Sequence, residues 1–460
     1  MIEKTGGESV STTAHKPQRL MQLIWRWHFY AGIIFAPFIV ILSITGAVYL
    51  FKPQLEDWLY RDDYYIQEPQ KQNGKLTPSM QVEAVRKVYP YGQITSYRPS
   101  DGPNRTAEVG VMDKGQSATV FVNPYSGRVV GQIKEDERLL EKIEKLHGEL
   151  MMGTMGDRLV ELAACWAMIL VITGLYLWWP KEKTIRGALI PRLTKGGRIF
   201  WRDAHAVTGV WLSGFAILLI LTGLPWSGVA GDLISKLATS THTGYPAFAF
   251  VGGPKPESAK PTKQVADVPW AAEKVPVPES SGEATPLPLE QVMEIAKANQ
   301  VASGYTVYFP EGDKGVYTVS LSADKPEDEM VLHIDQYSGK VLVRVGFSDY
   351  GWMAKVISIG IALHEGRYFG LPNQVIGLVV CLGLVAVAIS GLVMWWKRRP
   401  RGKLGAPALP KDAKLTRGLT AIVIGLGLLM PLAGLSMLFV FMVDRLVVKR
   451  LPAVQQWLGA

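Results

Sequence analysis

The sequence predicts a membrane α-helical bundle of five spans with an internal two-fold repeat, carrying two small α+β domains on one side of the membrane. Three observations predict it: five long segments without a charged residue, basic residues gathered in a few places, and two sets of residues that recur at identical offsets. A bilayer core about 30 Å thick takes roughly 20 apolar residues in a helix. A helix also satisfies its own backbone hydrogen bonds in lipid.

The five segments without Lys, Arg, Asp or Glu are long enough to cross a bilayer. They are residues 29–51, 162–180, 204–231, 368–396 and 418–443. The first is not a cleavable signal, because it is too long and no small-residue cleavage pattern follows it. Cys165 and Cys381 lie in separate spans, which excludes a disulfide framework and a c-type haem attachment. We expect both cysteines to be small buried side chains.

The net charge of +9 is distributed as the positive-inside rule predicts, and not as a nucleic-acid-binding surface. Seven Lys or Arg residues lie in 181–202, eight lie in 397–417, and Lys16, Arg19 and Arg26 precede the first span. These segments and the N-terminus are therefore expected in the cytoplasm, with 52–161 and 232–367 outside. Five spans would leave the C-terminal tail outside too, although it carries three basic residues.

Two pairs of spans repeat the same residues at the same offsets. His28 and His205 are each followed by Gly, Thr and Gly at offsets of 4, 17 and 18. His147 and His364 are each followed by Gly, then Thr or Ser, Gly, Trp and Trp at offsets of 6, 26, 27, 31 and 32. Each repeat unit is therefore span, outside domain, span, and the fifth span has no counterpart.

The two outside domains share a pattern of one helix and four strands. Helical spacing of apolar residues covers 78–88 and 289–298. Alternating apolar residues predict strands at 93–98, 107–112, 118–123 and 128–133, and again at 305–309, 316–320, 330–334 and 340–345. A Tyr-Ser-Gly turn joins the last two strands of each set as a hairpin.

These features define the predicted order of segments. The order is tail 1–20, span 21–52, domain 53–146, span 147–180, basic loop 181–203, span 204–231, domain 232–363 with a linker or surface loop at 252–288, span 364–396, basic loop 397–417, span 418–443 and C-terminal tail 444–460.

Four of the seven histidines lie at membrane boundaries in equivalent places of the repeat. The topology pairs His28 with His205 at the inner face and His147 with His364 at the outer face. Ionisable groups near the hydrocarbon are costly and usually functional. Two facing imidazoles can hold one haem iron axially between helices. Zinc is the weaker interpretation, because two histidines with scattered acids make an incomplete tetrahedral set.

The remaining candidates are assigned smaller roles. A glycine near each histidine would let a flat macrocycle approach the backbone; these are Gly32, Gly209, Gly153 and Gly370. Haem propionates and plain positive-inside charge are equally open roles for Arg26, Arg202 and Arg367. The Trp pairs fit an aromatic belt and the Thr-Gly and Ser-Gly pairs fit helix packing. No role in chemistry is expected for His15, His242 or His333, the last being a structural or surface residue.

An ordered set of motifs resembles the PepSY-associated transmembrane family, which includes iron-regulated inner-membrane proteins and ferric-siderophore reductases. The motifs are Trp27-His28-Phe29-Tyr30-Ala31-Gly32, Leu146-His147-Gly148-Glu149-Leu150, Gly174-Leu175-Tyr176-Leu177-Trp178-Trp179-Pro180, Leu363-His364-Glu365-Gly366 and the two Tyr-Ser-Gly hairpins. The resemblance covers roughly residues 20–400. It implies PepSY-like periplasmic domains, two haem b groups on span-end histidines, and electron transfer across the bacterial inner membrane to a periplasmic acceptor.

We therefore expect a di-haem b oxidoreductase, a ferric-chelate reductase that converts the Fe(III) of a siderophore to Fe(II) and releases the iron. No glycine-rich nicotinamide fingerprint follows a strand, so the electron donor is expected to be another protein or a membrane quinol. No catalytic side chain is singled out. Two alternatives stay open at this point: a non-redox PepSY protein that binds or inhibits a periplasmic partner, and a siderophore or metal permease.

Overall fold

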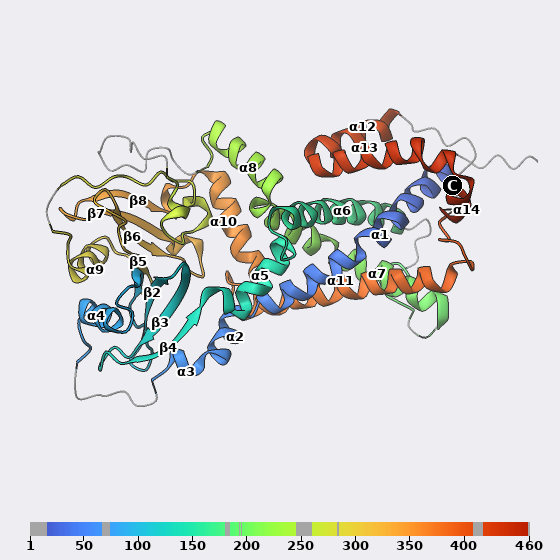
Figure 1. Ribbon diagram of the computed structural model, residues 1–460. Coiled ribbons are helices and arrows are strands. Elements are labelled where there is room, and N and C mark those ends of the chain that lie inside the picture. The colour runs from blue at the N-terminus through green and yellow to red at the C-terminus, as the bar shows by residue number, and fades with distance from the viewer. Residues whose placement is uncertain are drawn as a thin grey trace, which may run out of the picture. The chain divides into compact units, whose positions relative to one another are not determined.

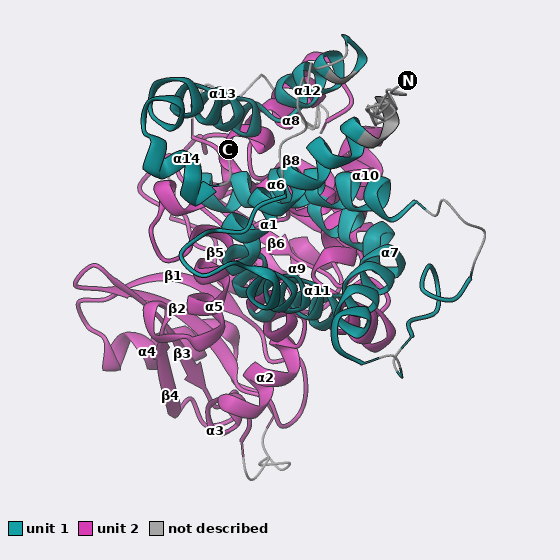
Figure 2. Cartoon of the chain, turned by 90° about the vertical axis from the view of Figure 1, so that its right-hand side faces the viewer, with its two compact units in different colours: residues 1–44, 158–220, 380–460 teal, residues 45–157, 221–379 magenta. Residues whose placement is uncertain are grey.

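The computed structural model describes residues 16–66, 74–179, 185–192, 194, 196–244, 260–282, 285–407 and 417–458. The chain forms two compact units, which Figure 2 shows in different colours. Residues 1–44, 158–220 and 380–460 make up the first, here called the span unit, and residues 45–157 and 221–379 make up the second, the sheet unit. Among the described residues, five helices are long and apolar enough to cross a membrane.

Four of these helices confirm predicted spans. They are α1 (Lys16–Tyr49), α6 (Thr154–Trp178), α7 (Gly197–Gly223) and α11 (Leu371–Arg398). The boundaries differ from the prediction where a histidine was expected to begin a span. His147 lies in a separate helix, α5 (Leu139–Glu149), and His364 ends another, α10 (Trp352–His364). Gly153 and Gly370 have positive φ in the turns that follow, a backbone conformation that interrupts a helix.

The fifth predicted span, 418–443, is wrong as a single helix. The chain forms α12 (Arg417–Leu429) and α13 (Pro431–Leu446), which lie side by side in Figure 1. Proline disfavours a helical residue before it, so α12 ends ahead of Pro431. A Cβ atom on Gly434 would lie 2.6 Å from the Gly427 carbonyl oxygen, which shows how closely the two backbones approach. The candidate span therefore begins at the proline and extends over Pro431–Arg450.

The α12–α13 hairpin packs against the middle of α6. Met430, at the bend, shares a buried apolar cluster with Cys165 and Met168, so both it and the cysteine are core residues. The Trp166 indole N–H donates a hydrogen bond of 2.9 Å to the Ser436 hydroxyl. The chain thus enters among the spans with α12 and turns back with α13.

The C-terminal helix α14 (Pro452–Leu458) returns to the basic segments. The Leu404 N–H donates to the Trp457 carbonyl at 2.9 Å, and the Tyr30 hydroxyl donates to the Leu458 carbonyl at 2.8 Å. Both contacts lie in the span unit. The expectation that the tail lies on the opposite side from the basic loops is therefore wrong. The hairpin accounts for these contacts, because α13 runs back beside α12.

The strands of the sheet unit form one antiparallel sheet in the order β4-β3-β2-β1-β5-β6-β7-β8. The strands are β1 (Gln93–Arg98), β2 (Ala107–Asp113), β3 (Gln116–Val122), β4 (Val129–Lys134), β5 (Thr306–Tyr308), β6 (Val316–Leu321), β7 (Met330–Asp335) and β8 (Val341–Gly346). All eight were predicted within two residues. The sequence did not predict that Ser96 and Tyr97 of β1 pair with Tyr308 and Val307 of β5, which joins the two sets into one sheet.

Helices α4 (Pro78–Val88) and α9 (Leu289–Ala298) cover one face of the sheet (Figure 1). Both were predicted with these bounds. Val85 of α4 and Val292 of α9 belong to a single buried core that includes residues from both sets of strands. Successive side chains of a strand point to opposite faces of the sheet. Val120 therefore lies in this core, while the neighbouring Phe121 packs with Tyr64 on the opposite face.

The opposite face is covered by α3 (Arg61–Tyr64), which follows α2 (Lys52–Leu59), and by part of the segment predicted as a linker. Residues 252–259 and 283–284 of that segment lie outside the described residues. The described part is not a plain linker, since Ala272 and Val275 are buried against Val343 of β8. Its sequence hides this role because proline, serine and charged residues separate the few apolar ones.

Of the other three histidines, the structure describes His242 and His333. His333 is fully buried on β7 and bonds to the Thr262 and Thr318 hydroxyls at 3.1 and 2.9 Å, which confirms a structural role. His242 is exposed just after α8 (Gly228–Ser240). His15 lies outside the described residues.

The close approach of α12 and α13 gives a test of the hairpin. We expect Gly434→Val to destabilise the protein by about 1–3 kcal/mol, because the new side chain meets backbone that cannot rotate away. Gly425→Val is the matched control, since a Cβ there meets nothing within 4 Å. Thermal unfolding of the detergent-solubilised protein measures both. Equal midpoints for the two variants would argue against a packed hairpin.

Candidate functional site

One pair of predicted histidines comes together in the span unit. His28 lies on α1 and His205 on α7, with ring centroids 6.3 Å apart and ring planes at 89°. Both side chains are half-buried. The two imidazoles lie edge to face at this distance, which is also short enough for one metal atom to bind a nitrogen of each ring.

The second pair comes together in the sheet unit with the same spacing. His147 on α5 and His364 on α10 have ring centroids 6.3 Å apart and ring planes at 72°. The Trp226 ring lies edge-on to His364, with 6.1 Å between centroids. The repeat in the sequence is therefore matched by two couples of nearly equal geometry, one in each unit.

Each of the four imidazoles is held by a hydrogen bond at Nδ1. Three Nδ1 atoms face a threonine hydroxyl, at 2.8, 2.9 and 3.1 Å. The pairs are His28 with Thr173, His147 with Thr45, and His364 with Thr222. The fourth, His205, lies 2.9 Å from the Val387 carbonyl oxygen and 3.4 Å from the Ser390 hydroxyl. These hydroxyls belong to the Thr-Gly and Ser-Gly pairs that were expected to be packing contacts only.

The partners in the span unit fix which nitrogen carries the proton. A carbonyl oxygen only accepts, so Nδ1 of His205 must be the donor to Val387. The Thr173 hydroxyl donates its one hydrogen to the Ile169 carbonyl at 2.7 Å, which leaves it an acceptor toward His28. In the neutral form, both imidazoles then have an unprotonated Nε2. A neutral imidazole with this tautomer is the form that ligates metal.

At three of the four hydroxyl residues, the glycine that follows lies against the imidazole. A Cβ atom added at Gly174 or Gly391 would lie 3.3 Å from Cε1 of His28 or His205. At Gly223 it would lie 3.2 Å from Cε1 of His364. These contacts are tighter than ordinary van der Waals packing, so the missing side chain lets each ring reach its hydroxyl.

The spacing of the couples fits a haem iron held by two imidazoles. A metal–nitrogen bond of about 2 Å and a ring nitrogen about 1.2 Å from its centroid give roughly 6.4 Å between centroids. The observed value is 6.3 Å in both couples. No described group of three or more His, Cys, Asp or Glu side chains is placed to hold a metal ion. Each couple therefore offers two nitrogens, which suits an iron whose other ligands come from a porphyrin.

The glycines predicted to admit a macrocycle border open space. A Cβ atom at Gly153, Gly209 or Gly370 would meet nothing within 4 Å, and one at Gly32 would reach only Leu170, at 4.0 Å. These four positions therefore have no close neighbour on the side where a side chain would stand.

The three arginines predicted near haem propionates already have protein partners. Arg26 donates to the Pro407 carbonyl at 2.6 Å, and Arg202 pairs with the buried carboxylate of Asp203 at 2.6 Å. Arg367 pairs with Glu329 at 3.2 Å and Glu365 at 2.6 Å, and donates to two backbone carbonyls. Any propionate contact would be shared with these groups.

Sequence reasoning missed the hydroxyl and carbonyl partners of the histidines. The signal was present for the hydroxyls, because Thr45, Thr173, Thr222 and Ser390 recur at fixed offsets from the histidines of their own repeat. Each binds a histidine from a different helix, however, and helix pairing is not visible in spacing along the chain. The Val387 carbonyl carried no signal, since every residue has one.

The apolar helices, the eight-stranded sheet and the paired histidines define a membrane helical protein with a β region. The family model described as PepSY-associated TM region matches residues 25–398, and the chain belongs to this family. No curated protein matches the chain.

The ion pair at Arg367 makes a prediction about pH. Burial raises the pKa of Glu329 from its ordinary value of 4.5 to about 7, while Arg367 opposes the shift. A carboxyl whose pKa is raised on folding stabilises the fold at low pH, and this contribution is lost as the pH rises from 4.5 to about 7. We expect Glu329→Gln to flatten the pH dependence of the unfolding midpoint over that window. Glu327→Gln, at an exposed neighbour, should leave it unchanged.

Proposed function

We propose that this protein is a di-haem b electron carrier of the bacterial inner membrane that reduces a ferric chelate in the periplasm, a ferric siderophore being the substrate that suits it best. The observation that carries the proposal is the pair of histidine couples, each with 6.3 Å between ring centroids and each with its Nδ1 atoms engaged. Membership of the PepSY-associated family supports it.

The residues of the chain would divide the work as follows. His28 and His205 would hold one haem, and His147 and His364 the other. The hydroxyls of the Thr-Gly and Ser-Gly pairs orient the imidazoles and keep the proton on Nδ1 in the span unit. Haem iron supplies one-electron chemistry when bound in this way, since it is stable as Fe(III) and as Fe(II).

The two couples are not equivalent in their hydrogen bonds, and this bears on the direction of electron flow. A carbonyl is a stronger acceptor than a hydroxyl, so the bond to Val387 makes the His205 imidazole the more basic ligand. A more basic ligand favours Fe(III) over Fe(II). A haem held by the couple in the span unit should therefore have a lower reduction potential than a haem held by the couple in the sheet unit. Electrons would then flow from the first haem to the second.

A ferric chelate is a chemically suitable acceptor. Siderophores bind Fe(III) through hard oxygen ligands, and Fe(II) is a softer, less charged ion that such ligands hold less well. A single electron therefore converts a tight complex into a weak one and releases iron. A carrier that delivers one electron at a time needs no further catalytic side chain for this step.

The orientation that we propose puts the basic segments and both termini in the cytoplasm and the sheet unit in the periplasm. Basic residues concentrate after α6 and after α11, as the positive-inside rule requires. The hydrogen bonds of α14 with Leu404 and Tyr30 bring the basic C-terminal tail to the same end of the span unit. The tail then no longer conflicts with the rule.

The direct test is a spectrum of the purified protein before and after reduction with dithionite. We expect sharp bands of low-spin b-type haem, and anaerobic addition of a ferric siderophore should reoxidise them while a ferrous-specific chelator develops colour. Colourless protein from haem-replete cells would refute the proposal. Bound haem that the siderophore fails to reoxidise would refute the acceptor and leave the cofactor assignment standing.

Replacement of the histidines should separate the two haems. We expect His28→Ala or His205→Ala to lose about half of the reduced-minus-oxidised absorbance, because each couple holds one group. His147→Ala or His364→Ala should lose the other half. His333→Ala is the control, since that imidazole is buried in the sheet and belongs to neither couple. Haem content counted by pyridine haemochrome measures each variant, and loss of both haems from one substitution would contradict the pairing.

Removal of the hydroxyl partners should shift one reduction potential upward. Thr173→Val takes away the acceptor for His28, so the imidazole becomes less basic and Fe(II) is favoured. A tenfold change in this preference corresponds to about 59 mV for one electron. Ser390→Ala should shift the potential less, because His205 keeps the Val387 carbonyl. Redox titration compares both with Ser213→Ala, whose hydroxyl donates to the Val210 carbonyl of its own helix.

A further inference from the structure

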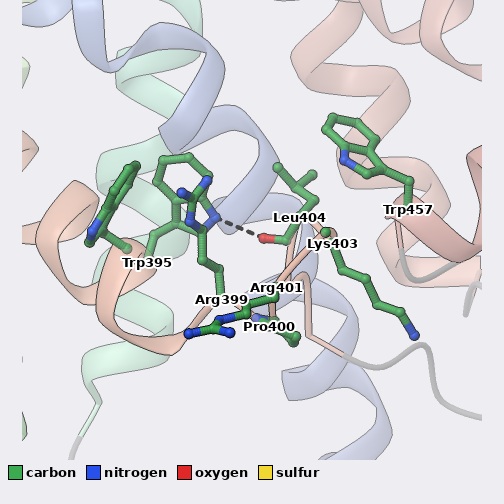
Figure 3. A pocket seen from close by; sticks show the side chains of 9 residues that line it. Trp395, Arg399, Pro400, Arg401, Lys403, Leu404 and Trp457 are labelled. Atoms are coloured by element: carbon green, nitrogen blue, oxygen red, sulfur yellow. Dashed lines mark hydrogen bonds between the residues drawn. The ribbon is translucent and has the colours of Figure 1, made fainter.

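The loop after α11 folds into a basic cavity that the proposed function does not use. The cavity has a volume of about 580 Å³ and is lined by Trp395, Trp396, Arg399, Pro400, Arg401, Gly402, Lys403, Leu404 and Trp457. Figure 3 shows Arg399, Arg401 and Lys403 on this loop, with Trp395 and Trp457 beside it. All of its lining residues belong to the span unit.

Hydrogen bonds hold the walls of the cavity in place. The Trp395 indole N–H donates to the Leu404 carbonyl at 2.7 Å, the dashed line in Figure 3, and the Leu404 N–H donates to the Trp457 carbonyl at 2.9 Å. Gly402 has a φ of 72°, which lets the loop turn back sharply. The loop is thus fastened both to α11 and to α14.

The cations of the cavity are available to an anion. No ion pair among the described residues involves Arg399, Arg401 or Lys403. The central carbon of the Arg399 guanidinium lies over the Trp396 ring, 3.8 Å from its centroid, a cation–π contact that uses no hydrogen-bond acceptor. The other basic loop differs, because there Arg192 and Arg202 both pair with the buried Asp203.

An apolar stripe on α11 continues from the cavity into the span. Ile389 and Leu382 lie seven and fourteen residues before Trp396, so all three share one face of the helix. They are 46%, 58% and 61% exposed, respectively. An anionic head held by the arginines would place acyl chains along this stripe, and tryptophan favours the membrane interface where such heads lie.

We propose that this cavity binds the phosphoryl headgroup of an anionic phospholipid. The basic loop after α11 and the tryptophans bind the headgroup, and the apolar stripe on α11 contacts the acyl chains. Zwitterionic lipids fit the same space with less gain, because their own cation opposes Arg399 and Arg401. The proposal does not depend on haem binding, since the lining residues are distinct from the four histidines and from the groups that hydrogen-bond to them.

Native mass spectrometry of the full chain with added phosphatidylglycerol or phosphatidylcholine tests the site. We expect retained phosphatidylglycerol to exceed phosphatidylcholine, and Arg399→Gln with Arg401→Gln to reduce its occupancy by about tenfold, given that each surface cation attracts anionic lipid. The double variant Arg186→Gln with Arg198→Gln removes equal charge from the exposed part of the other basic loop and should retain the lipid.

Three outcomes would overturn the proposal. Equal loss in both double variants would mean general attraction to basic residues. Displacement of phosphatidylglycerol by millimolar inorganic phosphate would mean a site for a soluble phosphoryl ligand. Equal retention of phosphatidylglycerol and phosphatidylcholine would mean that the cavity does not select lipids by the charge of the headgroup. Should the double variant elute as aggregate, Lys403→Gln tests the same headgroup contact at a position outside the Arg399–Trp396 stack.

Discussion

The hydrogen bond between an imidazole Nδ1 and a group on another helix is the interaction on which the proposed site depends. It occurs four times, and each time it joins two helices that are distant in sequence. Such bonds within a bundle have few competitors, because lipid supplies neither donors nor acceptors. They therefore fix ring orientation and helix pairing together. Without them, half-buried histidines near a membrane boundary would have many rotamers and no common distance.

Much of the architecture follows from periodicity and from the cost of unpaired backbone in lipid. Four spans, two sheet helices and eight strands were predictable, since each depends on residues that are close in sequence. The hairpin of α12 and α13 was not, because 26 uncharged residues resemble one span. Pro431 in that segment was the one feature that could have indicated a break in the helix. The pairing of β1 with β5 was also beyond reach, as it joins strands about two hundred residues apart.

The histidines of the candidate site were predictable from the sequence, but the groups that hold them were not. Duplicated offsets paired His28 with His205 and His147 with His364, and the structure brings both pairs to one distance. The hydrogen-bond partners of the histidines were not predictable, because Thr173 and Val387 each bind a histidine that lies on a different helix. Arginine roles were the least accessible from sequence. A guanidinium has five donors, and the partners that take them, such as Glu329 for Arg367, are chosen by tertiary structure.

The junction of β1 with β5 has a mechanical consequence. The helices that carry His147 and His364 are connected to opposite halves of the eight-stranded sheet, through β4 and β8. If the two halves were separate domains, the distance between these two imidazoles would change whenever one domain rotated relative to the other. One hydrogen-bonded sheet resists such rotation, so it helps to fix the distance between the two imidazoles. For the haem that we propose here, a site that need not rearrange on reduction would lose little energy to reorganisation.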